Sequence, residues 1–272
     1  MANAIRLIYG DAMILTLNPP IRGLILDLDG VLWKDDVPIN DTHSVFEKIR
    51  SLNLRYVFAT NNATRNVDQY LQKLSGFGVV PESWQIVNSG MAVAYLLAQR
   101  FPGGGPVYLS GGDGVRTALE EKGFFHSEKD VLAVVSSMDR SINYAKLCKV
   151  TLLIRSGIPF YGTNPDRTFP TPQGLVPGAG AILAAIESAT DVKPILGGKP
   201  SSAMMNLAME RLGTSPQQTL AVGDRLETDI LGGVNAGCRT ALVLSGVSTL
   251  QDLENWSPKP DLVADNLASL IG

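Results

Sequence analysis

The segment Asp27-Leu28-Asp29, with two aspartates, directly follows the apolar residues 24–26. On an extended chain, residues i and i+2 point to the same side, so we expect the two carboxylates to lie close together. Such a pair repels itself unless a cation or a shared proton compensates it, and this favours a divalent metal ion. Magnesium suits hard oxygen ligands and a phosphate-bearing substrate. For this segment taken alone, the alternative is a surface turn that Asp29-Gly30 closes.

A second acidic pair follows another apolar run near the end of the chain. Asp224 comes directly after residues 220–223, and Asp229 lies five residues later in a stretch with a helical pattern, residues 228–236. Taken alone, Asp224 could be a helix cap and Asp229 an acid favoured by the helix dipole. Together with the first pair, they predict a metal site.

One lysine and a short polar segment could bind an anion at the same place. Lys199 follows the strand-like residues 195–196 and would supply a positive charge among these acids, although an exposed lysine is the commoner case. Thr60, Asn61 and Asn62 also follow a predicted strand. They could donate hydrogen bonds to phosphoryl oxygens, and a simple turn is the alternative. A phosphate ester is therefore the substrate class that this set favours.

The elements that must position these residues alternate along the chain. Apolar strand-like runs are followed by helix-length amphipathic stretches almost throughout, which predicts a doubly wound Rossmann-like α/β fold with a parallel sheet. Ligands of such sheets bind outside the carboxyl ends of the strands, so one site could collect all the polar residues. The core strands that we predict end at residues 26, 59, 87, 196, 222 and 244.

Two clusters of turn residues divide the chain. Residues 102–106, Pro-Gly-Gly-Gly-Pro, are the strongest group of breakers, and residues 190–194 are also turn-rich. The stretch between them has its own alternation of strands and helices, and a single large sheet with long loops is the alternative. We predict a core in two parts, residues 1–102 (with an extension of unassigned role over about 1–20) and 194–272, and an inserted α/β cap over 103–193.

The composition limits the class of partner. An apolar share of 45% and a charged share of 18% are typical of soluble globular proteins. The net charge of −3 gives no basic field that would attract nucleic acid. No run approaches the roughly 18 apolar residues that span a membrane, and residues 12–17 lack the features of a signal peptide. We therefore expect a cytoplasmic protein, with Cys148 and Cys238 as two buried thiols.

Four segments resemble, in order, the motifs of the haloacid dehalogenase (HAD) superfamily. The resemblance extends from about residue 22 to the C-terminus and is closest to class IIA, the nitrophenylphosphatase and NagD-like group, in which a large cap lies between the second and third motifs. Serines within residues 134–140 depart from the pattern usual in that group. The matching core segments are residues 27–32, 60–62, 198–200 and 223–229, and residues 162–166 and 174–180 are similar to the cap signature.

The resemblance implies a catalytic role for four residues. Asp27 would attack phosphorus, and Asp29 would protonate the leaving oxygen and later activate the hydrolytic water. Thr60 and Lys199 would bind the transferring phosphoryl group. A carboxylate nucleophile splits hydrolysis into two easier steps, and an acid–base group contributes on the order of 10²- to 10⁴-fold.

The resemblance also implies a magnesium site and a reaction class. Asp27, the backbone carbonyl of Asp29 and Asp224 would ligate Mg²⁺, with Asp229 supporting the site from nearby. An aspartate rather than a threonine at position 29 favours hydrolysis over the transport-pump branch of the superfamily. The predicted activity is hydrolysis of small phosphate monoesters through an aspartyl-phosphate intermediate. A mutase-like phosphotransferase and a catalytically silent phosphometabolite-binding protein are the alternatives.

The polar loop over residues 163–174 is the predicted substrate reader of the cap. Asn164, Asp166 and Arg167 lie in it, and Arg167 could pair with a second anionic group of the substrate. A solvated surface loop is the alternative. If the cap closes over the core, as the resemblance suggests, this loop would contact the leaving group and exclude water. The expected partner is a small phosphorylated metabolite, and a homodimer through the cap is a further expectation.

Overall fold

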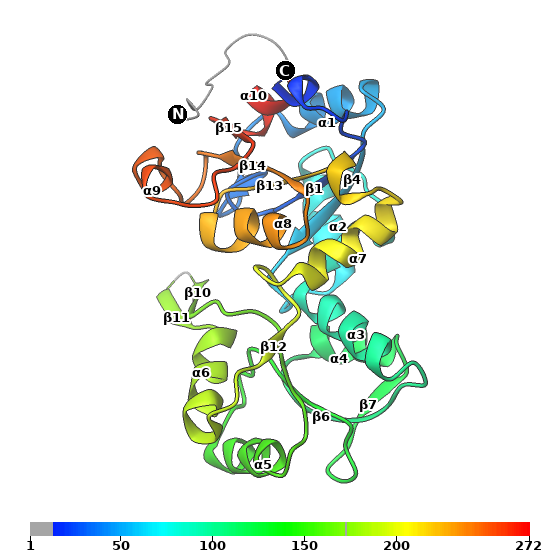
Figure 1. The fold of residues 1–272 in the computed structure, drawn as a ribbon, viewed down its shortest axis with the longest axis vertical. Helices are drawn as coiled ribbons and strands as arrows, with labels where there is room; N and C mark the ends of the chain where they lie inside the picture. The colour runs from blue at the N-terminus through cyan, green and yellow to red at the C-terminus, as the bar shows by residue number, and fades with distance from the viewer. Residues whose placement is uncertain (1–12, 172) are drawn as a thin grey trace. The chain divides into compact units, whose positions relative to one another are not determined.

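The protein folds into two compact units. A computed structural model of the chain describes residues 13–171 and 173–272, so part of the predicted N-terminal extension lies outside the described residues. The first unit contains the described residues up to Thr60 together with Val67–Val87 and Pro200–Gly272 (Figure 1). The second unit contains Asn61–Asn66 and Asn88–Lys199.

The first unit is built on a six-stranded sheet with the order β15-β14-β13-β1-β4-β5. The central strand β1 pairs in parallel with β13 on one side and β4 on the other, and its four residues are buried because helices cover both faces of such a sheet. This confirms the predicted doubly wound α/β fold. The strands are β1 Gly23–Leu26, β4 Arg55–Thr60, β5 Ile86–Asn88, β13 Thr219–Gly223, β14 Arg239–Val243 and β15 Leu262–Ala264.

Six α-helices and a small hairpin complete the described part of the first unit. Helix α1 begins after Asp41, whose side chain accepts a hydrogen bond from the backbone N–H of Ser44 and so caps the helix. Met13 and Ile14, in a 3₁₀ turn, are buried in the same hydrophobic core as α1 and β1. The helices are α1 Thr42–Ser51, α2 Val67–Gly76, α7 Ser202–Leu212, α8 Leu231–Asn235, α9 Leu250–Glu254 and α10 Leu267–Ile271, and the hairpin pairs β2 Trp33–Lys34 with β3 Val37–Pro38.

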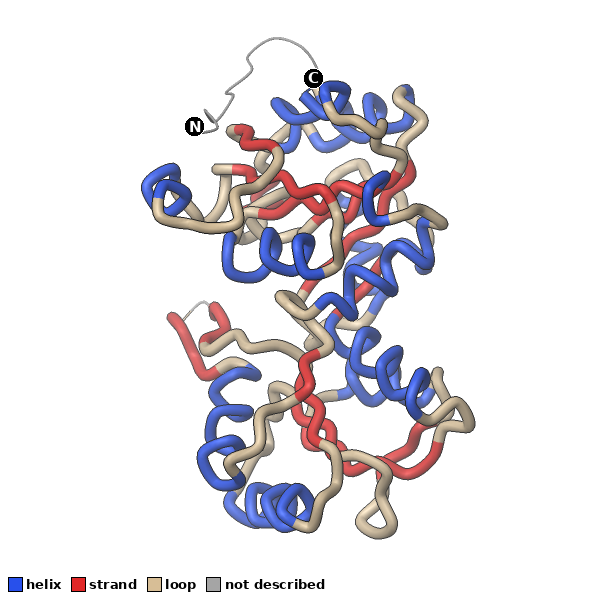
Figure 2. The backbone as a smooth tube through the Cα atoms, viewed as in Figure 1, coloured by secondary structure: helices blue, strands red, loops and turns tan. Residues whose placement is uncertain are grey.

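The second unit has its own five-stranded sheet with the order β12-β9-β8-β6-β7. Its strands pair in parallel, and helices lie beside them in the ribbon and tube views (Figures 1 and 2). The strands are β6 Gly105–Ser110, β7 Phe124–His126, β8 Val134–Ser136, β9 Phe160–Gly162 and β12 Ile195–Leu196. The helices are α3 Ser89–Arg100, α4 Asp113–Glu120, α5 Tyr144–Arg155 and α6 Ala179–Thr190, and a hairpin pairs β10 Thr168–Thr171 with β11 Gly174–Pro177.

Two elements lie in a different unit from the one that the sequence pattern suggested. We assigned residues 195–196 to the core sheet, but Ile195 pairs with Tyr161 and extends the sheet of the second unit. Helix α3 also belongs to the second unit, because its Val93 and Leu97 share a hydrophobic core with Val107 of β6. The compact second unit therefore begins before residue 103 and ends after residue 193.

The two cysteines differ in their surroundings. Neither is in a disulfide; Cys238 is buried, and burial raises the pKa of its thiol to about 12. Cys148 is only partly buried, which corrects our expectation of two buried thiols. It lines an apolar hollow between α5 and α6, together with Tyr144 and Leu152 of α5 and Ala185 of α6. No described helix is both long enough and apolar enough to cross a membrane.

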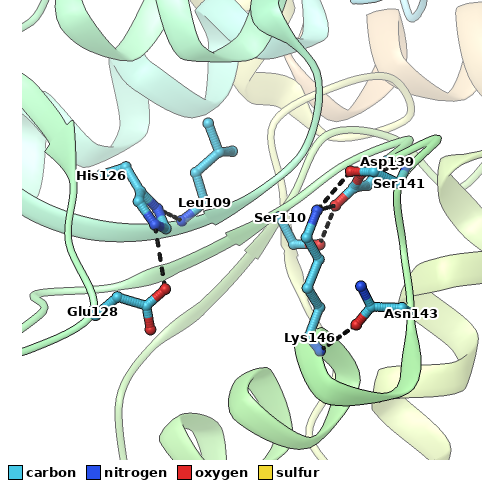
Figure 3. A network of polar contacts seen from close by, with 8 residues as sticks. All are labelled: Leu109, Ser110, His126, Glu128, Asp139, Ser141, Asn143 and Lys146. Atoms are coloured by element: carbon cyan, nitrogen blue, oxygen red, sulfur yellow. Dashed lines mark hydrogen bonds and ion pairs between the residues drawn. The ribbon is translucent and has the colours of Figure 1, made fainter.

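An ion pair between the partly exposed Lys146 and the buried Asp139 organises the loop after β8 in the second unit. Figure 3 shows the Lys146 side chain extending from α5 to Asp139, with 2.8 Å between Nζ and Oδ2. Ser110 and Ser141 donate further hydrogen bonds to the same carboxylate. Burial opposes ionisation of Asp139 more than any other single influence, but the hydrogen bonds from Lys146, Ser141 and Ser110 together outweigh it and lower its pKa.

Replacing Lys146 by Met should therefore destabilise the protein in a pH-dependent way. We expect a loss of about 1–3 kcal/mol at neutral pH, the usual cost of a buried polar group without its partner. A lowered native pKa gives stability that is present above the ordinary value of 3.8 and lost as the pH falls through the native value. The difference in unfolding free energy between wild type and Lys146→Met should therefore become smaller at acid pH.

Urea unfolding at neutral pH and at acid pH measures this difference. Lys149→Met is the matched control, because Lys149 lies on the same helix in an exposed pair with Glu128 at 3.5 Å. Such exposed pairs contribute about 0–1 kcal/mol. Equal losses of unfolding free energy in the two variants would contradict a special role for the pair with the buried Asp139.

Candidate active site

Three aspartates converge at one edge of the sheet in the first unit. The backbone N–H of Asp27 donates to the carbonyl of Val222 at 2.9 Å, so Asp27 directly continues β1 beside β13. Asp224 directly follows β13, and Asp229 lies on a π-helical turn, Leu226–Ile230. One carboxylate oxygen from each aspartate lies within 4.8 Å of those of the other two. The structure thus brings together three of the four acids that the sequence singled out.

Two of these carboxylates are buried and held in place by the backbone. Asp224 is 2% exposed, and its Oδ2 accepts a hydrogen bond of 2.7 Å from the N–H of Val247. Asp229 is 3% exposed, and its Oδ2 accepts one of 3.0 Å from the N–H of Arg225. Three neighbouring carboxylates, two of them buried, repel one another, and a hard divalent cation with oxygen ligands would relieve that repulsion. The donor set therefore fits magnesium.

Two glycines make room for the Asp224 carboxylate. Gly30 has a φ of +81°, and a Cβ there would come within 2.5 Å of Asp224 Oδ2. A Cβ on Gly246 would overlap the same oxygen. Any larger residue at either position would displace the carboxylate, and at Gly30 it would also strain the backbone. The glycine of the Asp27-Leu28-Asp29-Gly30 segment thus serves the acid site directly.

Asp29 is exposed, but its carboxylate is oriented by a buried tryptophan. The Nε1–H of Trp33 donates to Asp29 Oδ1 at 2.7 Å, and the Trp33 ring is almost fully buried. The ammonium group of Lys73 lies 4.4 Å from the centroid of that ring and also binds Asp36. The sequence analysis did not include Trp33 among the site residues and missed this contact. The available signal was that a buried indole N–H needs an acceptor, and Asp29 lies four residues away.

Thr60 occupies the sheet edge predicted for it. It is the last residue of β4, it is buried, and β4 pairs with β1 so that Phe58 lies opposite Leu26. Because parallel strands end at the same edge, Thr60 and Asp27 both lie at the carboxyl edge of this sheet.

The other predicted site residues belong to the second unit. Lys199 is 3% exposed, and its main chain is hydrogen-bonded to the side chain of Asn61. Asn164 is buried, with its Nδ2 donating to the carbonyl of Asn61 and its Oδ1 accepting from the N–H of Asp166. We predicted that Asn61 and Asn164 contact the substrate, whereas these hydrogen bonds join them to the protein itself.

Of the remaining three candidates, Asn62 and Asp166 are partly buried and Arg167 is exposed. Asn62 Oδ1 accepts hydrogen bonds from the N–H and the hydroxyl of Thr64 and so forms a tight turn. Arg167 is exposed, directly before β10.

Comparison with known proteins agrees with the geometry. A haloacid dehalogenase-like hydrolase model matches residues 24–125, and a HAD-hydrolase-like model matches residues 196–270. The 5'-nucleotidase YutF of Bacillus subtilis is 36% identical over 250 residues, which cover 92% of this chain and 97% of YutF. The chain belongs to the haloacid dehalogenase-like hydrolase family.

Solved structures place the HAD protein more narrowly. The 4-nitrophenylphosphatase of Thermotoga maritima is 36% identical, with a TM-score of 0.85 over 92% of this chain and 96% of that one. The glycerol phosphate phosphatase of Mycobacterium tuberculosis, solved in complex with magnesium, is 30% identical, with a TM-score of 0.86 over 96% of this chain and 79% of that one. The predicted membership of the nitrophenylphosphatase and NagD-like group is confirmed, and the HAD protein is an enzyme of the phosphatase type.

Proposed function

We propose that this HAD phosphatase hydrolyses small phosphate monoesters with the help of magnesium, through an aspartyl-phosphate intermediate on Asp27. The observation that carries the proposal is the convergence of Asp27, Asp224 and Asp229 within 4.8 Å at the carboxyl ends of β1 and β13. Ligands of open α/β sheets bind at such an edge. A relative solved with magnesium supports the choice of metal.

The residues present could hold the metal ion. Asp27, Asp224 and the backbone carbonyl of Asp29 would be its ligands, and Asp229, hydrogen-bonded to the N–H of Arg225, would add negative charge beside them. When bound, magnesium would neutralise charge among the carboxylates and the phosphate and favour attack on phosphorus.

The reaction proceeds in two displacements at phosphorus. A carboxylate oxygen of Asp27 attacks, the bond from phosphorus to the ester oxygen breaks, and Asp29 gives its proton to that leaving oxygen. Asp29, now a carboxylate, takes a proton from water as the water oxygen attacks the aspartyl phosphate. Asp27 and inorganic phosphate are released. The hydrogen bond from Trp33 keeps the Asp29 carboxylate in one orientation through both steps.

The other predicted roles concern the substrate. We propose that Thr60 and Lys199 bind the transferring phosphoryl group, the roles that their motifs imply. Asn62, Asp166 and Arg167 are the proposed contacts for the rest of the substrate. The expected partner is a small phosphorylated metabolite rather than nucleic acid, in keeping with the net charge of −3. The homodimer and the cytoplasmic location stay predictions.

A phosphate-release assay tests the proposal. With magnesium present, we expect the purified protein to release phosphate from nitrophenyl phosphate and from at least one ester in a panel of nucleoside monophosphates, sugar phosphates and glycerol phosphate. The relatives named above include a nucleotidase and a glycerol phosphate phosphatase, and an acid sugar phosphatase of Staphylococcus aureus is 34% identical to this chain; these three activities set the panel. Absence of release from every ester would contradict the proposal. Transfer to an added alcohol in place of release would indicate a phosphotransferase.

A further inference from the structure

We propose that Asn61 is a positioning residue, which acts on the reaction by fixing the main chain of Lys199. The inference rests on the proposed role of Lys199 in binding the phosphoryl group. It assigns to Asn61 a task other than contact with the substrate.

The Asn61 side chain binds both polar groups of one residue. Its Oδ1 accepts a hydrogen bond of 2.8 Å from the N–H of Lys199, and its Nδ2 donates one of 3.0 Å to the carbonyl of Lys199. An amide is the side-chain group that offers a donor and an acceptor in this pairing. Since Lys199 is almost fully buried, its N–H and C=O need such partners. Asn61 therefore takes the place of a neighbouring strand for this residue.

A second set of contacts fixes Asn61 in turn. Its carbonyl accepts hydrogen bonds from the hydroxyl of Ser89 at 2.5 Å and from Nδ2 of Asn164 at 2.7 Å. Ser89 is fully buried and Asn164 nearly so. Neither the backbone nor the side chain of Asn61 can shift without breaking a buried hydrogen bond.

At position 198 the chain passes so close to Asn61 and Thr163 that only glycine fits. A Cβ on Gly198 would lie 2.6 Å from Asn61 Oδ1 and 2.6 Å from the carbonyl of Thr163. The N–H of Gly198 donates to that carbonyl. The residue preceding Lys199 is thus held between two segments that are distant in sequence, and this leaves the lysine backbone one position.

The four hydrogen-bonded residues Asn61, Ser89, Asn164 and Lys199 all lie within one unit. Asn61, Ser89 and Lys199 lie at or next to three positions at which the chain passes from one unit to the other, and Asn164 lies in the loop after β9. All four belong to the second unit. Lys199 consequently keeps its place relative to Asn61 in any arrangement of the two units.

A double-mutant cycle tests the proposal. We expect Asn61→Ala to lower kcat/KM for nitrophenyl phosphate on the order of 10²-fold, because small displacements of a positioned group cost that much. In a Lys199→Ala background, the same change should alter kcat/KM by no more than about twofold, since Asn61 would have nothing left to position. Asn143→Ala is the matched control. It removes an asparagine cap of α5 in the same unit and should leave kcat/KM unchanged.

Each outcome decides the question. Equal losses from Asn61→Ala in both backgrounds would show that Asn61 acts independently of Lys199 and would overturn the proposal, as would unchanged activity in the single variant. If Asn61→Ala does not fold, Ser89→Ala replaces it, with an expected loss of about two- to tenfold that disappears in the Lys199→Ala background. Unchanged activity of Ser89→Ala would then overturn the proposal.

A binding measurement separates this inference from the proposed function. A wild-type protein that binds orthophosphate in the presence of magnesium but hydrolyses no ester would refute the proposed function alone. The cycle would then be run on orthophosphate affinity, with the same pattern expected. A wild-type protein that neither hydrolyses esters nor binds orthophosphate would refute both.

Discussion

Replacing Asp27 by Asn is expected to abolish phosphate release, with a fall on the order of 10⁴-fold or more in kcat/KM. An amide cannot form the acyl phosphate, and no other group of the site is proposed to take its place as nucleophile. Wild type quenched in acid during turnover should carry one phosphoryl group by intact mass, and Asp27→Asn should carry none. Both proteins should show the same circular dichroism spectrum, since the change is nearly isosteric.

Asp68→Asn is the matched control for this variant. Asp68 lies in the first turn of α2 in the same unit, and its side chain is exposed. The chemical change is identical, but Asp68 lies outside the site motifs and is not one of the three acids that converge, so turnover should be normal. Normal turnover in Asp27→Asn would reject the assignment of the nucleophile.

Magnesium should stabilise the wild-type protein, and Asp224→Asn should remove that stabilisation. Ligand at about 100 times its Kd contributes about 2.7 kcal/mol to a folded protein with one site. With chelator present, we expect Asp224→Asn to unfold at the same temperature as wild type or higher, because one of three mutually repelling carboxylates is gone. With magnesium present, wild type should unfold at a higher temperature than Asp224→Asn. The magnesium concentration for half-maximal activity should rise at least 10- to 100-fold in the variant.

Thermal unfolding with chelator, magnesium or calcium measures this crossover. Asp252→Asn is a suitable control, because Asp252 forms the capping box of α9 with Thr249 and is not one of the three acids that converge, so its loss should not change the response to magnesium. Two results would contradict a metal site formed by Asp27, Asp224 and Asp229. One is full activity of the wild type in chelator, and the other is a wild-type melting temperature that does not change when magnesium is added.

The core of the site could be predicted from the sequence because the signal is local. Asp27, Thr60 and Asp224 each lie at or just beyond the end of a buried strand, and parallel strands end at one edge. Runs of apolar residues followed by polar ones are visible without coordinates. The paired strands then bring the groups together, whatever the loops between them do.

The contacts of Asn61 and the pairing of β12 could not be predicted from the local sequence pattern. The hydrogen bonds between Asn61 and Lys199 join residues 138 positions apart, and an asparagine after a strand looks the same whether it binds phosphate or backbone. The two-residue strand β12 was assigned to the wrong sheet for a related reason. A short apolar run indicates a strand, but its pairing with Tyr161 and Gly162 depends on long-range packing.

The discontinuous makeup of the second unit matters for anyone who exchanges such inserted regions between relatives. A gene fragment that encodes residues 103–193 alone lacks α3, and the apolar surface of Val107, Val115 and Leu119 that Val93 and Leu97 cover would face water. It also lacks Ile195 and Leu196, which would leave the β9 edge without its neighbour strand. Bare edges and apolar faces invite aggregation. A chimaera that remains in solution would have to transplant residues 61–66 and 88–199 together, as two separate pieces of one body.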